Sequence, residues 1–328
     1  MRAKRIATGL LAGIIALAFG LSGSAVSADK YPSRTITWLI PYGPAGGFDL
    51  HSRAMIVGMK KALGVNIIIR NRPGAGGNIA WNLTWGAKPD GYTITTVNIP
   101  GAIVSELFGK PTPEYRLKEF SWIGQISAAP YMWAVGAKTP FKTLEDFQKA
   151  KEVLVTGSGV GGTEWVTSTL TGRVMKFNIK QILGFPSAPA ANMAIVRGEG
   201  HARGLGLDSP GQMAFIHDGT MRPMWVYLDK RDPDFPNVPT VGELGYPGLS
   251  VLASHRVVAA PPGMPKDRLA MLQKAFDAAT RDPEVLERFR RMKARIEPVV
   301  GEDWNKMLGE FYGLIQEHGA VFKAALQK

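Results

Sequence analysis

Two glycine-rich stretches of this chain have the residue types and the sequence context of anion-binding loops. "GPAGGFD" spans residues 43–49 and "TGSGVGGTEW" spans residues 156–165; each follows a strand-like run and precedes a segment with helical spacing. The backbone N–H groups at the start of a helix have no partner within the helix, and the helix dipole adds partial positive charge there. Both loops are therefore predicted to bind anionic groups without a lysine or arginine.

The second loop leaves three interpretations open. Its "GSGVGG" run, from Gly157 to Gly162, fits G-x-G-x-x-G. A dinucleotide site also needs an acidic residue about 20 positions further on, and the next predicted strand ends near Gly184 and Phe185 without one. The loop is then a bare tight turn, a dinucleotide site or a site for another anion, and the pattern favours the last.

The patterns that usually indicate catalysis or metal binding are not met. Thr156 and Val160 occupy the glycine positions that a nucleophile elbow around Ser158 would need. The only Gly-Lys pair is followed by Pro111, so there is no phosphate-binding P-loop. The chain has no cysteine, and its five histidines are scattered singly. We expect no catalytic residue, no metal and no cofactor.

The elements that must position the two loops alternate along the chain. Apolar runs closed by Gly or Pro predict strands, and stripes with a spacing of three or four predict helices. This alternation predicts parallel sheets with helices on their faces. The predicted strands are 35–42, 65–71, 92–98, 152–157, 179–185, 202–208 and 221–228; the predicted helices are 49–63, 77–87, 143–150, 163–175, 189–199, 209–219, 269–279, 283–292 and 302–326. Thr143 is a predicted N-cap, and Pro283 a predicted first-turn proline.

Residues 1–28 have the three regions of a secretory signal peptide. A basic start precedes an apolar middle, and small residues at Val26 and Ala28 predict cleavage after Ala28. The alternative is a membrane anchor, because the uncharged stretch from Ile6 to Ala28 is long enough to span a bilayer. Its content of Gly, Ser and Ala and its cleavage site favour export to the periplasm.

The net charge of +12 favours anionic partners, and loss of the three basic residues of the signal peptide leaves about +9. Charge does not distinguish a small acid from nucleic acid, but export disfavours nucleic acid. The densest basic run, "RFRRMKAR", is typical of the solvated face of a helix.

Several segments, in order, resemble the solute receptors of tripartite tricarboxylate transporters, also called the Bug or TctC family. They are "YPSRTITWLIPYGPAGGFDLHSR", "NIIIRNRPGAGGNIAWN", "KPDGYTI", "DFPNVPTVGELGYPG" and "PPGMP". The resemblance covers the chain from Tyr31 to its end. It implies an α/β protein with the two-lobed periplasmic-binding-protein (Venus-flytrap) fold, in which each lobe is a mainly parallel sheet flanked by helices. Residues 29–133 and 254–328 would form lobe 1, and residues 134–253 would form lobe 2.

The resemblance also implies a function and a site. The protein would be a monomer that captures a di- or tricarboxylate by lobe closure and delivers it to a transporter with one large and one small membrane subunit. The alternatives are a receptor that senses the solute for a signalling partner, and an exported enzyme using Asp49 or Asp208 as a base. The implied ligand-binding residues are Tyr42, Ala45, Gly46, Gly47, Phe48, Asp49, Asn78, Ser158, Gly159, Gly162, Thr163, Ser187, Ala188 and Asp208.

Two aromatic residues depart from the family pattern. Phe48 follows the glycine pair where a small hydroxyl residue is common, and Trp165 lies near the place of a family histidine. They would either stack on an aromatic dicarboxylate or pack inside the lobes. Asp49 would either cap its helix and pair with Arg53 at helical spacing, or contact the ligand.

Overall fold

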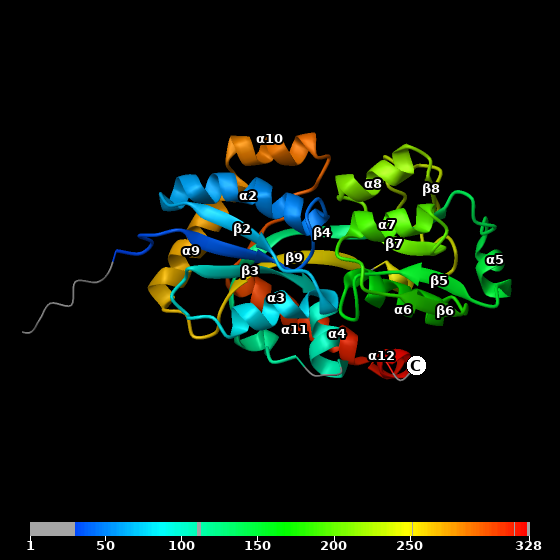
Figure 1. Ribbon diagram of the computed structural model, residues 1–328, viewed down its shortest axis with the longest axis horizontal. Helices are drawn as coiled ribbons and strands as arrows, with labels where there is room; N and C mark the ends of the chain where they lie inside the picture. The colour runs from blue at the N-terminus through cyan, green and yellow to red at the C-terminus, as the bar shows by residue number, and fades with distance from the viewer. Residues whose placement is uncertain (1–29, 110–112, 251, 318, 327–328) are drawn as a thin grey trace, which may run out of the picture. The chain divides into compact units, whose positions relative to one another are not determined.

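The computed structural model describes residues 30–109, 113–250, 252–317 and 319–326 (Figure 1). The predicted signal peptide, with its cleavage site after Ala28, lies outside the described residues. All elements below belong to one compact unit, Arg34–Lys328. None of the described helices is both long and apolar enough to cross a membrane.

Ten strands of this unit form one continuous sheet. Their order is β2-β1-β3-β9-β4-β7-β5-β6, and β8 and β10 both pair with β4. The strands are β1 (Ile36–Ile40), β2 (Ile67–Asn71), β3 (Thr93–Ile99), β4 (Ser121–Gly136), β5 (Val153–Thr156), β6 (Ile179–Ile182), β7 (Ala202–Gly206), β8 (Met221–Val226), β9 (Ala253–Ala260) and β10 (Val299–Val300).

Strand β4 belongs to both halves of this sheet. Its residues Ser121–Pro130 pair antiparallel with β9, and Tyr131–Gly136 pair antiparallel with β7 or β8. On one side β1 pairs parallel with β2 and β3, and on the other β5 pairs parallel with β6 and β7. We call the β1–β3 side, with the helices that cover it, the first half, and the β5–β8 side the second half.

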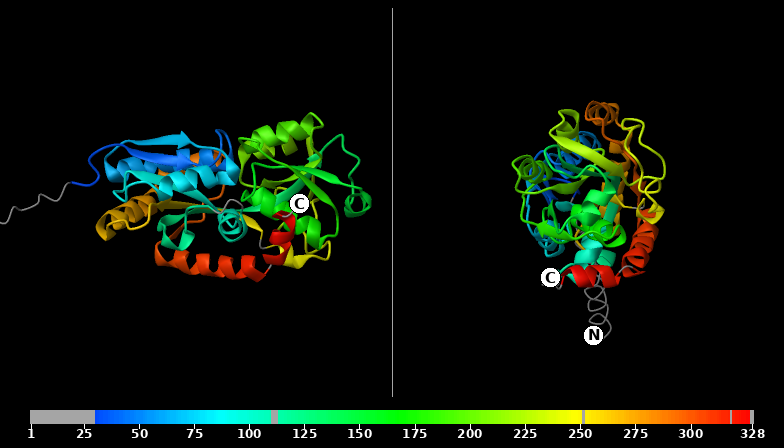
Figure 2. Two further views of the ribbon diagram at one scale, coloured as in Figure 1. Left: turned by 60° about the horizontal axis from the view of Figure 1, so that its bottom comes forward. Right: turned by 90° about the vertical axis from the view of Figure 1, so that its right-hand side faces the viewer.

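Helices cover both faces of each half (Figures 1 and 2). In the first half α2, α9 and α10 lie on one face, and α3, α4 and α11 lie on the other; in the second half α7 and α8 lie opposite α5 and α6. The helices are α2 (Gly47–Leu63), α3 (Asn78–Trp85), α4 (Gly101–Phe108), α5 (Leu144–Lys149), α6 (Thr163–Val174), α7 (Ala188–Val196), α8 (Pro210–His217), α9 (Lys266–Thr280), α10 (Pro283–Arg291), α11 (Glu302–Glu317) and α12 (Gly319–Leu326).

The structure confirms the predicted α/β organisation and several local signals. Thr143 caps α5 in a capping box with Asp146, and Pro283 occupies the first turn of α10. Strands β4 and β9 were not among the predicted elements. Pro130 argues against a strand because proline cannot donate a ladder hydrogen bond, but here it lies where β4 exchanges one set of partners for the other.

Close helix packing holds α2, and so the first glycine loop, against the sheet. A Cβ atom built on Gly58 of α2 would lie 2.7 Å from the Cα atom of Ala279 in α9. Helix α2 ends at Leu63 and is capped by Gly64, whose φ of 69° is the left-handed conformation that suits glycine. The glycine at position 58 therefore permits a close contact between two helix backbones, and this contact fixes the direction in which the start of α2 points.

Candidate functional site

A small pocket of about 40 Å³ lies where the start of α2 meets the second half of the molecule. Its wall combines the first turns of α2, α6 and α7 with residues of β4, β7, α8 and β9. The lining residues are Tyr42, Gly46, Gly47, Phe48, Tyr131, Ser158, Glu164, Ser187, Ala188, Arg203, Ser209, Gln212, Ser254 and Arg256.

The wall contains only part of the predicted site. Seven predicted residues do not line the pocket: Ala45, Asp49, Asn78, Gly159, Gly162, Thr163 and Asp208. Sequence reasoning missed another set of lining residues: Tyr131, Glu164, Arg203, Ser209, Gln212, Ser254 and Arg256. The missed set includes three charged side chains, so the sequence prediction described the pocket as a site of backbone donors and missed its charges.

The first glycine loop has the predicted geometry. Helix α2 starts at Gly47 with Gly46 as its N-cap, and no described residue accepts the backbone N–H of either glycine. A Cβ atom on Gly47 would lie 2.4 Å from Ser209 Oγ and 2.8 Å from Arg256 Nη2. Gly47 is therefore required by close approach, and the two unpaired N–H groups belong to residues of the pocket wall.

Asp49 serves the loop and not the pocket. Its Oδ2 accepts hydrogen bonds from the Ala45 backbone N–H at 3.1 Å and from Arg53 Nε at 2.9 Å, and its Oδ1 accepts one from Asn71 at 3.0 Å. The predicted ion pair with Arg53 is present. Asp49 is buried, and these bonds hold Ala45 at a φ of 63°. Asp49 thus fixes the shape of the loop and pairs with Arg53, and its contact with a ligand stays a prediction.

The second glycine loop differs from the prediction because its own chain supplies the anion. Glu164 Oε1 accepts hydrogen bonds from the Ser158 backbone N–H at 2.8 Å and from Ser158 Oγ at 2.5 Å. A Cβ atom on Gly162 would lie 2.5 Å from the same oxygen. The glycines make room for a buried carboxylate that belongs to the protein, so the anion bound at the Ser158 N–H is Glu164 itself.

Two other predicted residues, Gly159 and Thr163, join the two halves. A Cβ atom on Gly159 would lie 2.6 Å from the Gly76 backbone nitrogen, and Thr163 donates a hydrogen bond to Asn98. Asn78 bonds locally, donating to the Ala75 carbonyl at 2.7 Å. Gly159 and Thr163 thus contact the first half beside the pocket, and the contact of these residues with a ligand stays a prediction.

Contacts between the halves surround the pocket. The Gly43 backbone N–H donates to the Pro186 carbonyl at 2.7 Å, and Ser187 both lines the pocket and caps α7. His51 of α2 contacts Asp208 across the same boundary, with 3.0 Å between Nε2 and Oδ2. The pocket is therefore built from both halves at once, and separation of the halves would dismantle it.

Asp208 acts through Arg256. Arg256 donates to both oxygens of Asp208, each at 2.8 Å, and also to Ser127 Oγ at 2.9 Å. Burial by itself would raise the pKa of Asp208, but Arg256 and His51 lower it well below its usual range. Asp208 was predicted to line the cleft. In the structure it is the counter-ion of Arg256, and Arg256 lines the pocket.

Arg203 is the second buried guanidinium of the wall. Its Nη1 donates to the Ala188 carbonyl at 2.9 Å and its Nε to the Gly204 carbonyl at 3.3 Å. Within the part of the chain that the structure describes, no carboxylate forms an ion pair with it. Burial lowers its pKa, and the nearby Glu164 opposes this effect. An arginine in the short apolar run "ARGLGLD" was the available sequence signal for this position.

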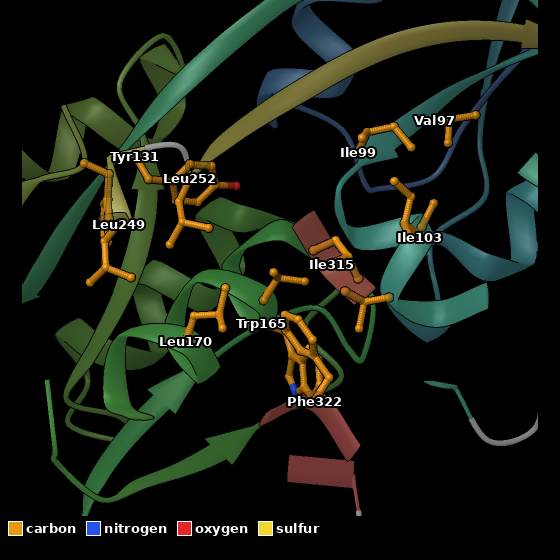
Figure 3. Packing of buried hydrophobic residues seen from close by; sticks show 14 of the residues in the cluster. Val97, Ile99, Ile103, Tyr131, Trp165, Leu170, Leu249, Leu252, Ile315 and Phe322 are labelled. Atoms are coloured by element: carbon orange, nitrogen blue, oxygen red, sulfur yellow. The ribbon is translucent and has the colours of Figure 1, made fainter. Parts of the chain in front are cut away.

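The two aromatic residues that depart from the family pattern, Phe48 and Trp165, have different environments. The ring of Phe48 lies in the pocket wall, 4.8 Å from the ring of Tyr42 and beneath the Arg256 guanidinium at 5.3 Å. Trp165 is buried away from the pocket and stacks on Phe322 of α12 with 6.2 Å between ring centroids (Figure 3). Trp165 therefore packs internally, and only Phe48 remains available to a ligand.

Metal ligands are not clustered in the described ranges: no group of three or more His, Asp or Glu side chains there could hold a metal ion. Arg203 and the start of α2 provide the pocket's positive charge that no described carboxylate neutralises, whereas Arg256 is paired with Asp208.

Comparison of the sequence with known proteins identifies a family and several relatives. The model of the tripartite tricarboxylate transporter family receptor (TctC) matches residues 52–318. A UPF0065 protein of Bordetella bronchiseptica is 30% identical over 311 residues, which is 94% of this chain and 89% of that protein. Protein BugT of Bordetella pertussis is 25% identical over 95% of this chain and 98% of its own length.

Solved structures show the same fold. The periplasmic binding protein BugD superimposes with a TM-score of 0.78 at 23% identity, covering 88% of this chain and 99% of its own. MatC from Rhodopseudomonas palustris, solved with bound malate, gives a TM-score of 0.76 at 24% identity over 90% and 100% of the two chains. Rpa4515 of R. palustris, solved with adipate, superimposes with a TM-score of 0.79 at 22% identity. The superposition covers 89% of this chain and 98% of Rpa4515. The predicted periplasmic-binding-protein fold is thus confirmed.

Proposed function

Because this chain belongs to the receptor family of the tripartite tricarboxylate transporters, we propose that it is an exported solute-binding protein for a small carboxylate. The ligand binds in the pocket at the start of α2, and the protein releases it chemically unchanged. The proposal includes delivery to a large and a small membrane subunit, residence in the periplasm after cleavage behind Ala28, and a monomeric state.

One observation carries this proposal. The pocket combines the unpaired N–H groups of Gly46 and Gly47 with the Arg203 guanidinium, which has no acidic partner among the described residues. An Arg fork and helix-start N–H groups both recognise carboxylates, and both gain strength when buried. The relatives MatC and Rpa4515, solved with malate and adipate, support the ligand class.

We place the boundaries between the lobes near Trp133 and Ser254, at the two strands that connect the halves. Strand β4 changes its partners just before Trp133, and Ser254 lies at the start of β9. Lobe 1 would then contain residues 29–133 and 254–328, and lobe 2 residues 134–253. Bending of these two strands would open and close the pocket, as in other hinged receptors.

The test is a thermal-shift and calorimetric screen of mono-, di- and tricarboxylates against the purified protein. A ligand at 100 times its dissociation constant should add about 2.7 kcal/mol to the free energy of unfolding. Arg203→Gln should remove this gain, whereas Arg173→Gln, at an exposed position of α6, should keep it. If no carboxylate binds, or if the recovered ligand has been converted, the proposal is wrong.

A further inference from the structure

We propose that the pocket selects a short carboxylate that also carries an ammonium group. This inference rests on the proposed function and defines its ligand class more closely. It comes from the charges of the wall: Arg203 and Glu164 are both buried, both line the pocket, and neither forms an ion pair with another described residue.

The remaining charges at this site are already matched. Arg256 and Asp208 form a two-bond ion pair with side chains only 2% and 1% exposed. Their charges cancel locally, so Arg256 contributes no uncompensated charge to the wall. What remains is one guanidinium and one carboxylate, which together complement a ligand that has one negative and one positive group.

Glu164 is held so that one of its oxygens stays available. Both hydrogen bonds from Ser158 end on Oε1, and no described residue donates to Oε2. The residue is 7% exposed. A second ligand carboxylate near Oε2 would meet a like charge in a site with little solvent, whereas an ammonium group would donate a charge-assisted hydrogen bond.

Arg203 supplies the complementary position. Its Nε and Nη1 donate to backbone carbonyls, and no described residue accepts from Nη2. Arg203 and Glu164 influence each other electrostatically without reaching the distance of an ion pair. The gap between them is where a ligand can place opposite charges against both, with its carboxylate toward Arg203 and its ammonium group toward Glu164.

The experiment compares ligands that differ by one group. Succinate becomes β-alanine, and glutarate becomes 4-aminobutanoate, when an ammonium group replaces one carboxylate. Isothermal titration calorimetry should show at least one amino carboxylate binding ten times or more tightly than its dicarboxylate partner. Glu164→Gln keeps the size and an acceptor for Ser158, and it should weaken that amino carboxylate at least tenfold while leaving or strengthening the dicarboxylate. Glu145→Gln, in the exposed first turn of α5, is the matched control and should change neither.

The outcomes separate the two proposals. If both dicarboxylates bind as tightly as their amino partners or more tightly, or if Glu164→Gln weakens both classes equally, selection by Glu164 is wrong and carboxylate binding stands. If the wild-type protein binds no carboxylate in the wider screen, the proposed function itself fails, and the selection fails with it.

Discussion

Substitution of Asp208 by Asn tests whether a buried ion pair holds the pocket wall in place. Asp208 accepts two hydrogen bonds of 2.8 Å from Arg256 and contacts His51 at 3.0 Å, and its side chain is 1% exposed. The amide of Asn keeps the shape but cannot neutralise the guanidinium. Leaving one partner of a buried pair uncompensated typically costs about 3–5 kcal/mol. We expect the free energy of unfolding to fall by that amount.

The assay is urea unfolding of the ligand-free protein at pH 7, followed by circular dichroism. The midpoint should fall while the slope stays constant, since the surface exposed on unfolding is unchanged. Adding Arg256→Met to the Asp208→Asn variant should recover at least half of the loss, because no unpaired charge then remains. Glu287→Gln, at an exposed ion pair on α10, should show no comparable loss. A loss below about 1 kcal/mol for Asp208→Asn, or no recovery in the double variant, would refute the reasoning.

Three further predictions concern the pocket and the core. Gly47→Ala should weaken carboxylate binding at least tenfold in calorimetry, because its Cβ would lie 2.4 Å from Ser209 Oγ; unchanged affinity would contradict the close approach. Burial lowers the pKa of His255 from 6.5 to about 4. As the pH falls, His255 therefore takes up a proton in the unfolded chain at a higher pH than in the folded protein. Stability should therefore drop by about 3 kcal/mol between pH 6.5 and pH 4, and urea titrations of His255→Gln should lack this component. Trp165→Ala should cost about 3–5 kcal/mol of stability yet leave ligand affinity unchanged, and a selective loss of affinity would place Trp165 in the site.

The sequence by itself determined the alternation of strands and helices in each half, because periodicity and turn residues are local properties, but it missed β4 and β9, which join the halves. It also located the start of α2 and its unpaired N–H groups, since orphan N–H groups occur at any helix start and "GPAGG" marks one. The pairing of Asp49 with Arg53 followed from helical spacing for the same reason. The motifs taken together determined the family.

Only the tertiary structure decided which charges face the ligand. Arg203 and Arg256 lie on strands β7 and β9, which are not neighbours in the sheet order, and no local pattern says that one is neutralised by Asp208 while the other is unpaired. In the sequence, Glu164 is an ordinary acidic residue in the first turn of a helix. Only the folded structure shows that its carboxylate accepts a hydrogen bond from the Ser158 N–H. A charge acquires its role from what lies within a few ångströms of it, and for these residues folding alone brings those neighbours together.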